Sequence, residues 1–173
     1  MIFNRIILKN VFAYQFADIK LDGAKKGKNI VLIQGRNNFG KTSIINAVKL
    51  LFVGPNREMC LSVQQGRELK PKQYVQGLGE DWMGILNRRA KRAGKTNCSV
   101  KIFWEEEGFE AVEATRSWRI RESSFDEKLE VDLEGERQIH IEGEDAQKFL
   151  NERLPEDFLP FFFFDGEQIQ RIA

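Results

Sequence analysis

The sequence predicts an α/β fold, and three observations support that fold class. Residues 29–34 form a short apolar run rich in β-branched side chains, which is typical of a buried strand. After a glycine-containing loop, apolar residues recur at helical spacing from residue 44 to residue 52, and Gly54-Pro55 supplies a stop signal. Between residues 98 and 141, strand-like runs alternate with turns, as in an antiparallel meander. Because the chain shows only one strand–helix unit, we expect an incomplete parallel core beside an antiparallel sheet.

Length and composition are those of an ordinary globular domain. The 173 residues predict a single domain, and a hydrophobic content of 42% is enough for a core. The 27 Lys and Arg residues nearly balance the 26 Asp and Glu residues, so the net charge is +1. No global basic field points to nucleic acid, and any DNA contact must therefore be local.

Cysteine, histidine and hydropathy patterns argue against several other classes. Cys60 and Cys98 form no C-x-x-C pair and no dense disulfide pattern, which favours a reducing compartment. The single histidine, His140, lies between two isoleucines, where we expect a surface position on a strand rather than a metal cluster or a Ser-His-Asp triad. The chain lacks a signal-peptide pattern and any apolar run near the ~20 residues of a membrane span. We therefore expect a cytoplasmic protein.

The loop between the expected strand and helix carries the motif G-x-x-x-x-G-K-[ST] at residues 35–42, which is typical of a nucleotide phosphate-binding loop, or P-loop. Backbone N–H groups of such a loop surround the anion, and the helix N-terminus adds positive potential. The alternative is a glycine turn capped by Thr42, but the flanking strand and helix favour the P-loop. The predicted nucleotide-binding residues are Gly35, Arg36, Asn37, Asn38, Phe39, Gly40, Lys41, Thr42 and Ser43.

Each side-chain type in this loop suits one task in nucleotide binding. The two glycines allow turn geometry and close approach of the backbone, and Asn38 tolerates a positive φ. Lys41 is placed to reach the β- and γ-phosphates, which makes it the candidate catalytic residue. Thr42 can offer its hydroxyl to Mg²⁺, and Ser43 can hydrogen-bond the α-phosphate.

The remaining elements are predicted from periodicity and turn signals. They are a hairpin over residues 2–9 and 15–21, loop and short helix over 55–78, a helix over 80–93, a short helix over 145–154 and a buried strand over 159–164. The helical segment of about residues 55–95 is thus expected to be an insertion into the P-loop core.

The expected helix over residues 80–93 ends in the densest basic cluster of the chain. Two interpretations compete. Basic residues in a last turn are favoured by the helix dipole and by solvation, and we prefer this account. The alternative is contact with the phosphate backbone of DNA. The residues concerned are Arg88, Arg89, Lys91, Arg92 and Lys95.

The apolar run over residues 159–164 ends at Asp165. Four phenylalanines followed by an acidic residue resemble a Walker B strand. Ligands gather at the carboxyl ends of strands in open α/β sheets, so Asp165 is a candidate for supporting Mg²⁺ together with Thr42. The alternative is an Asp-Gly turn after a core strand.

Together, the hairpin, P-loop, helix and antiparallel strands resemble the N-terminal lobe of the head of SMC/RecF-type ABC ATPases over essentially the whole chain. More narrowly, residues 10–14 and 159–170 are similar to the DndD family, the ATPases of bacterial DNA phosphorothioation systems. The resemblance implies ATP and Mg²⁺ as ligands. It also implies a coiled coil after Ala173, a C-terminal lobe and a second head that sandwich the nucleotide, and DNA and other DNA-modification proteins as partners.

In the wider family, the segment after the 159–164 strand is the Q-loop, whose glutamine contacts the metal and the attacking water. If Gly166 and Glu167 match the family's Gly-Glu, Asp165 occupies the glutamine position, and we favour this alignment. Gln168 is the other candidate. The sequence departs from the family at Phe12-Ala13, where many members place an arginine near the phosphates.

The resemblance implies the ATP-binding lobe of a DNA-associated ATPase, and the lobe alone is expected to bind ATP but to hydrolyse it poorly. The signature motif, the true Walker B aspartate and the catalytic glutamate would lie in the absent C-terminal lobe. The alternatives are an ATPase of another DNA repair or anti-phage system, a small self-contained P-loop NTPase, and a non-enzymatic DNA-binding module. A guanine-reading Asn-Lys-x-Asp motif is missing, which disfavours a GTPase switch.

Overall fold

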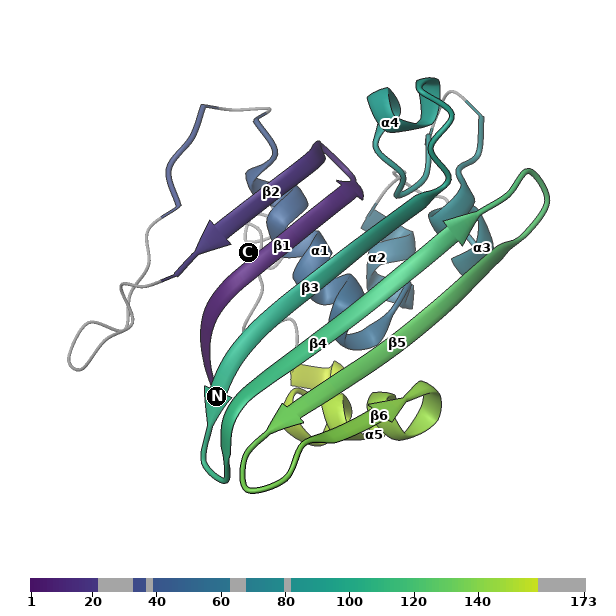
Figure 1. The fold of residues 1–173 in the computed structure, drawn as a ribbon. Coiled ribbons are helices and arrows are strands. Elements are labelled where there is room, and N and C mark those ends of the chain that lie inside the picture. Colours follow the sequence, from purple (N-terminus) through teal and green to yellow (C-terminus); the bar gives the residue numbers. More distant parts are fainter. Residues whose placement is uncertain (22–32, 37–38, 63–67, 80–81, 159–173) are drawn as a thin grey trace, which may run out of the picture.

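The computed structural model describes residues 1–21, 33–36, 39–62, 68–79 and 82–158. In this part of the chain, six strands form one antiparallel sheet in the order β2-β1-β3-β4-β5-β6 (Figure 1). The strands are β1 (Ile2–Val11), β2 (Tyr14–Lys20), β3 (Asn97–Glu106), β4 (Phe109–Ile120), β5 (Phe125–Glu134) and β6 (Ile139–Glu142). The helices are α1 (Lys41–Val53), α2 (Arg57–Ser62), α3 (Pro71–Gln76), α4 (Arg88–Arg92) and α5 (Gly143–Arg153), followed by a short 3₁₀ helix, Glu156–Phe158. Figure 1 shows α1, α2 and α3 behind the sheet, which leaves its other face open.

The covered face of the sheet follows from the alternation of side chains along each strand. Over most of their length, β3 and β4 alternate fully buried residues with more exposed ones. Val100, Ile102 and Trp104 have no exposed surface, and each lies opposite a buried residue of β4. This two-residue period confirms the predicted antiparallel meander, and the pairing of β1 with β2 confirms the predicted hairpin.

The P-loop helix α1 supplies the centre of the core. Leu50, Leu51 and Phe52 are fully buried. The Phe52 ring lies 6.1 Å from the Trp104 ring and 6.0 Å from the Phe3 ring, so α1 packs against β1 and β3. Burial of each large apolar side chain contributes about 1.5–3 kcal/mol, which holds the helix firmly on the sheet. Among the described helices α1 is the longest, with 13 residues, and none has the length and apolar composition of a membrane span.

The helix predicted over residues 80–93 is wrong for most of its first part, because among its described residues, 82–93, only Arg88–Arg92 is helical. The preceding residues make backbone hydrogen bonds to distant segments. Ile85 N–H donates to the Val75 carbonyl at 3.1 Å, and the Ile85 carbonyl accepts from Phe12 N–H at 2.7 Å. Gly84 has φ of +83°, and a Cβ there would lie 2.6 Å from the Val75 carbonyl oxygen. Long-range backbone pairing therefore overrides the local helical pattern.

Two predicted strands lie largely outside the described residues. Of the strand predicted over residues 29–34, the structure describes only Ile33 and Gln34, which are exposed and belong to no strand. The strand predicted over residues 159–164 lies wholly outside the described part, as do Asp165 and Gln168. The predicted loop and short helix after Pro55 and the predicted helix near residue 145 are confirmed as α2, α3 and α5.

Candidate nucleotide site

The described P-loop residues surround the start of α1. Gly40 is the N-cap of α1, and its φ of +89° is a left-handed conformation that favours glycine. A Cβ at this position would lie 2.9 Å from the Ala13 Cβ, so the close packing of the loop on the β1–β2 turn also requires glycine. The Lys41 Nζ folds back over the loop and donates hydrogen bonds to the carbonyl oxygens of Gly35 at 2.6 Å and Arg36 at 3.0 Å.

The N-terminus of α1 has the features of an anion site. No side chain of the described residues caps it, and its first turn contains no acidic residue. The first N–H groups of a helix have no intrahelical acceptor, and the dipole of a 13-residue helix adds positive charge there. Thr42 is exposed and Ser43 is partly buried beside this end. This arrangement suits the binding of nucleotide phosphates, and the Thr42 hydroxyl is the kind of hard oxygen ligand that Mg²⁺ prefers.

Tyr14 is a site residue that the sequence did not single out. Its hydroxyl donates a hydrogen bond of 3.2 Å to the carbonyl oxygen of Gly40, which ties the N-cap of α1 to β2. Burial raises the pKa of Tyr14, so the hydroxyl stays protonated and remains a donor. A tyrosine at the start of a strand carries no local signal of this role, because Gly40 lies 26 residues further along the chain.

A cleft of about 730 Å³ opens beside the P-loop. Phe39 and Ser43 line one side, the β1–β2 turn contributes Phe12 and Ala13, and the segment from Trp82 to Arg89 forms the opposite wall. This volume lies in the range of small-molecule sites, about 300–1,000 Å³. The structure thus brings the start of α4 to the candidate nucleotide site.

Asn87 fixes α4 next to this cleft. Its Oδ1 caps the helix by accepting hydrogen bonds from the backbone N–H groups of Arg89 at 3.0 Å and Ala90 at 3.1 Å. Its Nδ2 donates to the Phe12 carbonyl at 2.8 Å, and its backbone N–H donates to the Asn10 carbonyl at 2.9 Å. Asn87 is only 6% exposed, so a buried side chain joins the helix to the β1–β2 turn.

The basic cluster predicted from the sequence is divided between two clefts. All five of its side chains are exposed. Arg88 and Arg89 line the cleft beside the P-loop, whereas Lys91 and Lys95 line a second cleft of about 670 Å³. The second cleft also contains Arg119 and Arg121 from the end of β4. Arg92 lines neither of these clefts, and Leu86 lines both, so the two clefts adjoin.

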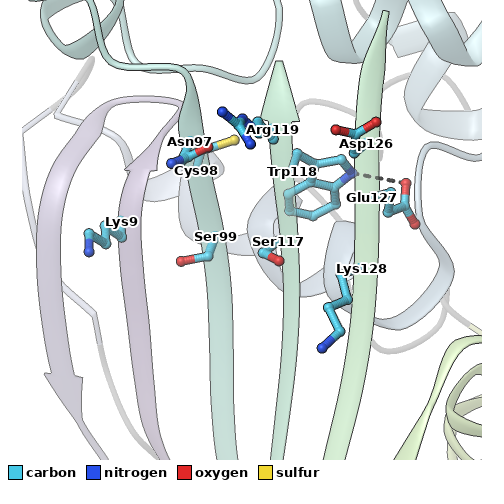
Figure 2. Close-up of a pocket in the computed structure, with 10 residues that line it drawn as sticks. All are labelled: Lys9, Asn97, Cys98, Ser99, Ser117, Trp118, Arg119, Asp126, Glu127 and Lys128. Atoms are coloured by element: carbon cyan, nitrogen blue, oxygen red, sulfur yellow. Dashed lines mark hydrogen bonds between the residues drawn. The ribbon is translucent and has the colours of Figure 1, made fainter. Parts of the chain in front are cut away.

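A third, smaller cleft of about 260 Å³ lies on the sheet, at the ends of β3, β4 and β5 (Figure 2). The Trp118 Nε1 donates to a Glu127 carboxylate oxygen at 2.9 Å along one side of it. Burial raises the pKa of Cys98 to about 12, so its thiol stays protonated and is a poor nucleophile. None of the described residues that line this cleft belongs to the P-loop.

His140 occupies the exposed strand position predicted for it, on β6. Its Nδ1 forms a 2.6 Å hydrogen bond with the Asp132 carboxylate. Among the described residues, His140, Glu130 and Glu142 form the one group of side chains whose ligand atoms lie close enough together to hold a metal ion. The Lys128 ammonium, however, pairs with Glu130 at 2.7 Å and with Glu142 at 3.4 Å. The group is therefore a charge network on the open face of the sheet.

Four predicted site residues lie outside the described part of the chain: Asn37, Asn38, Asp165 and Gln168. The structure brings the other P-loop residues together at the start of α1, and the roles assigned to them and to Asp165 stay predictions.

Comparison with known proteins agrees with the geometry of the loop. A family model described as an AAA domain matches residues 5–172, which include the hairpin, the P-loop, the sheet and the segment that contains Asp165. A search of the curated proteins found no match to this sequence. Because the family model covers nearly the whole chain, the protein belongs to the AAA domain family, whose members include SMC-like ATPases.

Proposed function

We propose that this chain is the ATP-binding lobe of an SMC-like ATPase that works on DNA. The main support for this proposal is the start of α1, which combines a glycine in the left-handed backbone conformation, a helix N-terminus without a side-chain cap and a lysine that folds over the loop. With ATP bound, Lys41 exchanges its two carbonyl contacts for the β- and γ-phosphates, and Ser43 meets the α-phosphate. Thr42 and Asp165 are the residues that would hold Mg²⁺, which would supply positive charge against the phosphate oxygens.

Nucleotide binding by the chain tests this proposal directly. Calorimetry should show binding of ATP with Mg²⁺ and weaker binding of GTP. Lys41→Ala should abolish binding without unfolding the chain, because Lys41 adds charge at the phosphates and little to the core. Circular dichroism of the variant checks its fold. Unchanged ATP affinity in a folded Lys41→Ala variant would refute the P-loop assignment.

Hydrolysis in this proposal requires a second surface. Positioning the phosphates is only part of phosphoryl transfer, and a water-activating carboxylate and an opposing signature motif belong to a C-terminal lobe and a second head. Steady-state ATPase assays of the chain with and without that lobe should show turnover only when both are present. Robust turnover by residues 1–173 alone would favour a self-contained NTPase instead.

We further propose that the process served is DNA phosphorothioation. The similarity of residues 10–14 and 159–170 to DndD-family ATPases supports this choice. Deleting the gene in its host and measuring phosphorothioate-linked dinucleotides by mass spectrometry of digested DNA tests it, with plasmid-borne wild type and Lys41→Ala as the complementing pair. Unchanged dinucleotide levels would favour the alternative, an ATPase of another DNA repair or anti-phage system.

A DNA contact through the exposed cations of α4 completes the proposal. Lys91 and Lys95 share a cleft with Arg119, with Arg121, which pairs with Asp126, and with Glu122, so cations from two distant segments outnumber the carboxylates there. Such a group suits the phosphate backbone of DNA, because each phosphate contact releases counterions. The competing explanation is that the α4 cations only solvate the helix end.

A further inference from the structure

The two arginines at the start of α4 line a different cleft from Lys91 and Lys95. Arg88 and Arg89 line the 730 Å³ cleft that Ser43 and Phe39 of the P-loop region also line. Ser43 directly follows the P-loop pattern, and its hydroxyl is the one expected from the sequence to hydrogen-bond the α-phosphate. The cleft therefore begins where the α-phosphate would lie and has room for the rest of a nucleotide.

The wall that carries these arginines is held in place by distant contacts. Phe12 N–H donates to the Ile85 carbonyl at 2.7 Å, and Asn87 joins the start of α4 to the Phe12 carbonyl. The Trp82 Nε1 donates to the Tyr74 carbonyl at 2.7 Å, and the two rings lie 5.3 Å apart. A wall fixed before the ligand binds loses little conformational entropy on binding.

The charge of the cleft matches a phosphate ligand. None of the described residues that line it is acidic, and neither Arg88 nor Arg89 has an ion-pair partner among the described residues. Guanidinium groups bind phosphates through two parallel N–H donors, which makes arginine well suited to this contact. Aromatic side chains from three segments, Phe12, Phe39 and Trp82, line the same cleft and offer surfaces for a base.

We propose that Arg88 and Arg89 are nucleotide-binding residues, and that this cleft is the subsite for the α-phosphate and nucleoside of the bound nucleoside triphosphate. The inference rests on the proposed function of the P-loop and extends it to a segment well separated from the P-loop along the chain. It separates the basic cluster by task, since Arg88 and Arg89 serve the nucleotide while Lys91 and Lys95 line the second cleft.

The test compares two double variants of the same helix with the same change of charge. Arg88→Gln with Arg89→Gln should weaken ATP binding about tenfold in calorimetry, whereas Lys91→Gln with Arg92→Gln should change it less than twofold. Both pairs are exposed, and the cap of α4 comes from the Asn87 side chain, so both variants should keep the wild-type circular dichroism spectrum.

A second ligand separates a subsite from a general electrostatic effect. Inorganic pyrophosphate can fill the β- and γ-phosphate positions but offers neither an α-phosphate nor a nucleoside, so its affinity should fall less than threefold in the Arg88–Arg89 variant. Equal losses for ATP and pyrophosphate, or equal losses in the two double variants, would overturn the subsite. One outcome would refute this inference alone: the wild type binds ATP, the Lys41→Ala variant does not, and the Arg88–Arg89 variant binds as well as the wild type. The P-loop function would then stand. If wild type does not bind ATP, the proposed function itself fails.

Discussion

The Nε of Arg116, on β4, donates a 2.9 Å hydrogen bond to the carbonyl oxygen of Leu51, in the last turn of α1. Arg116 is 4% exposed and also pairs with the Glu127 carboxylate at 2.5 Å. Burial lowers the pKa of Arg116, and the Glu127 carboxylate counteracts that shift. A cation at a helix C-terminus opposes the negative end of the dipole and satisfies a carbonyl that has no intrahelical donor. The helix that presents the P-loop is thus anchored to the sheet at its far end.

Replacing Arg116 with methionine should lower the free energy of unfolding by about 3 kcal/mol, because the substitution leaves the Leu51 carbonyl without its side-chain donor and removes the cation that pairs with Glu127. Urea denaturation followed by circular dichroism measures this loss. The matched control is Arg121→Met, which breaks an exposed 2.6 Å pair with Asp126 and should cost at most about 1 kcal/mol. Equal losses in the two variants would show that the buried contact has no special importance.

Gly40→Ala should destabilise the fold and weaken ATP binding at least tenfold. Its left-handed backbone disfavours a side chain by about 1–2 kcal/mol, and the new Cβ would also collide with Ala13. Gly94→Ala is the control, since Gly94 has φ of +72° but a Cβ added there would meet no other atom within 4 Å. Gly94→Ala should cost only the backbone strain and leave ATP affinity unchanged, as measured by denaturation and calorimetry.

Asp165→Ala should weaken the Mg²⁺ dependence of ATP binding, or of turnover in the complete ATPase, because its strand is predicted to end near the γ-phosphate. Gln168→Ala is the comparison. Titration of Mg²⁺ at fixed ATP decides between them. An effect of the Gln168 change alone would assign the Q-loop role to Gln168.

Replacing Lys91, Arg92 and Lys95 with glutamine should flatten the salt dependence of DNA binding in the assembled protein. The slope of log K against log[salt] should fall by about 0.9 for each DNA phosphate that the variant no longer neutralises. Fluorescence anisotropy with a labelled duplex at several salt concentrations provides the slopes.

The control for this DNA experiment carries the same change of charge on other elements, at the exposed residues Lys20, Arg137 and Lys148. An equal change of slope in both variants would indicate a general charge effect. An unaltered slope in the α4 variant would leave only the helix-dipole explanation of its cations.

Stability should depend on pH through His140. The hydrogen bond to Asp132 raises the pKa of His140 above its ordinary value of 6.5. A raised folded-state pKa means that the protonated form stabilises the fold at low pH, and that this contribution disappears as pH rises through the folded-state pKa. Because the chain has a single histidine, NMR titration of its ring protons reports this pKa directly. Asp132→Asn should lower it, and an unchanged pKa would contradict the contact.

The sequence by itself determined the elements whose signals are local. The P-loop and α1 are consecutive, so motif spacing and helical periodicity predicted both, and Gly40 indeed has the positive φ that the loop requires. The hairpin and the meander follow from alternation every two residues, which depends on neighbours along one strand. The surface position of His140 was predicted in the same way.

Only the tertiary structure decided which distant residues meet. Residues 82–87 are not helical because their backbone groups bond to β1, the β1–β2 turn and α3, partners that helical periodicity does not register. The same pairing brings Arg88 and Arg89 to the P-loop cleft, whereas Lys91 lines the second cleft. Arg116 lies on the buried face of β4, at a position where alternation along the strand predicts an apolar residue. Its burial is explained by the hydrogen bond to the carboxyl end of α1, 65 residues earlier in the chain. Such contacts depend on long-range hydrogen bonds and charge compensation, which no local pattern of residues encodes.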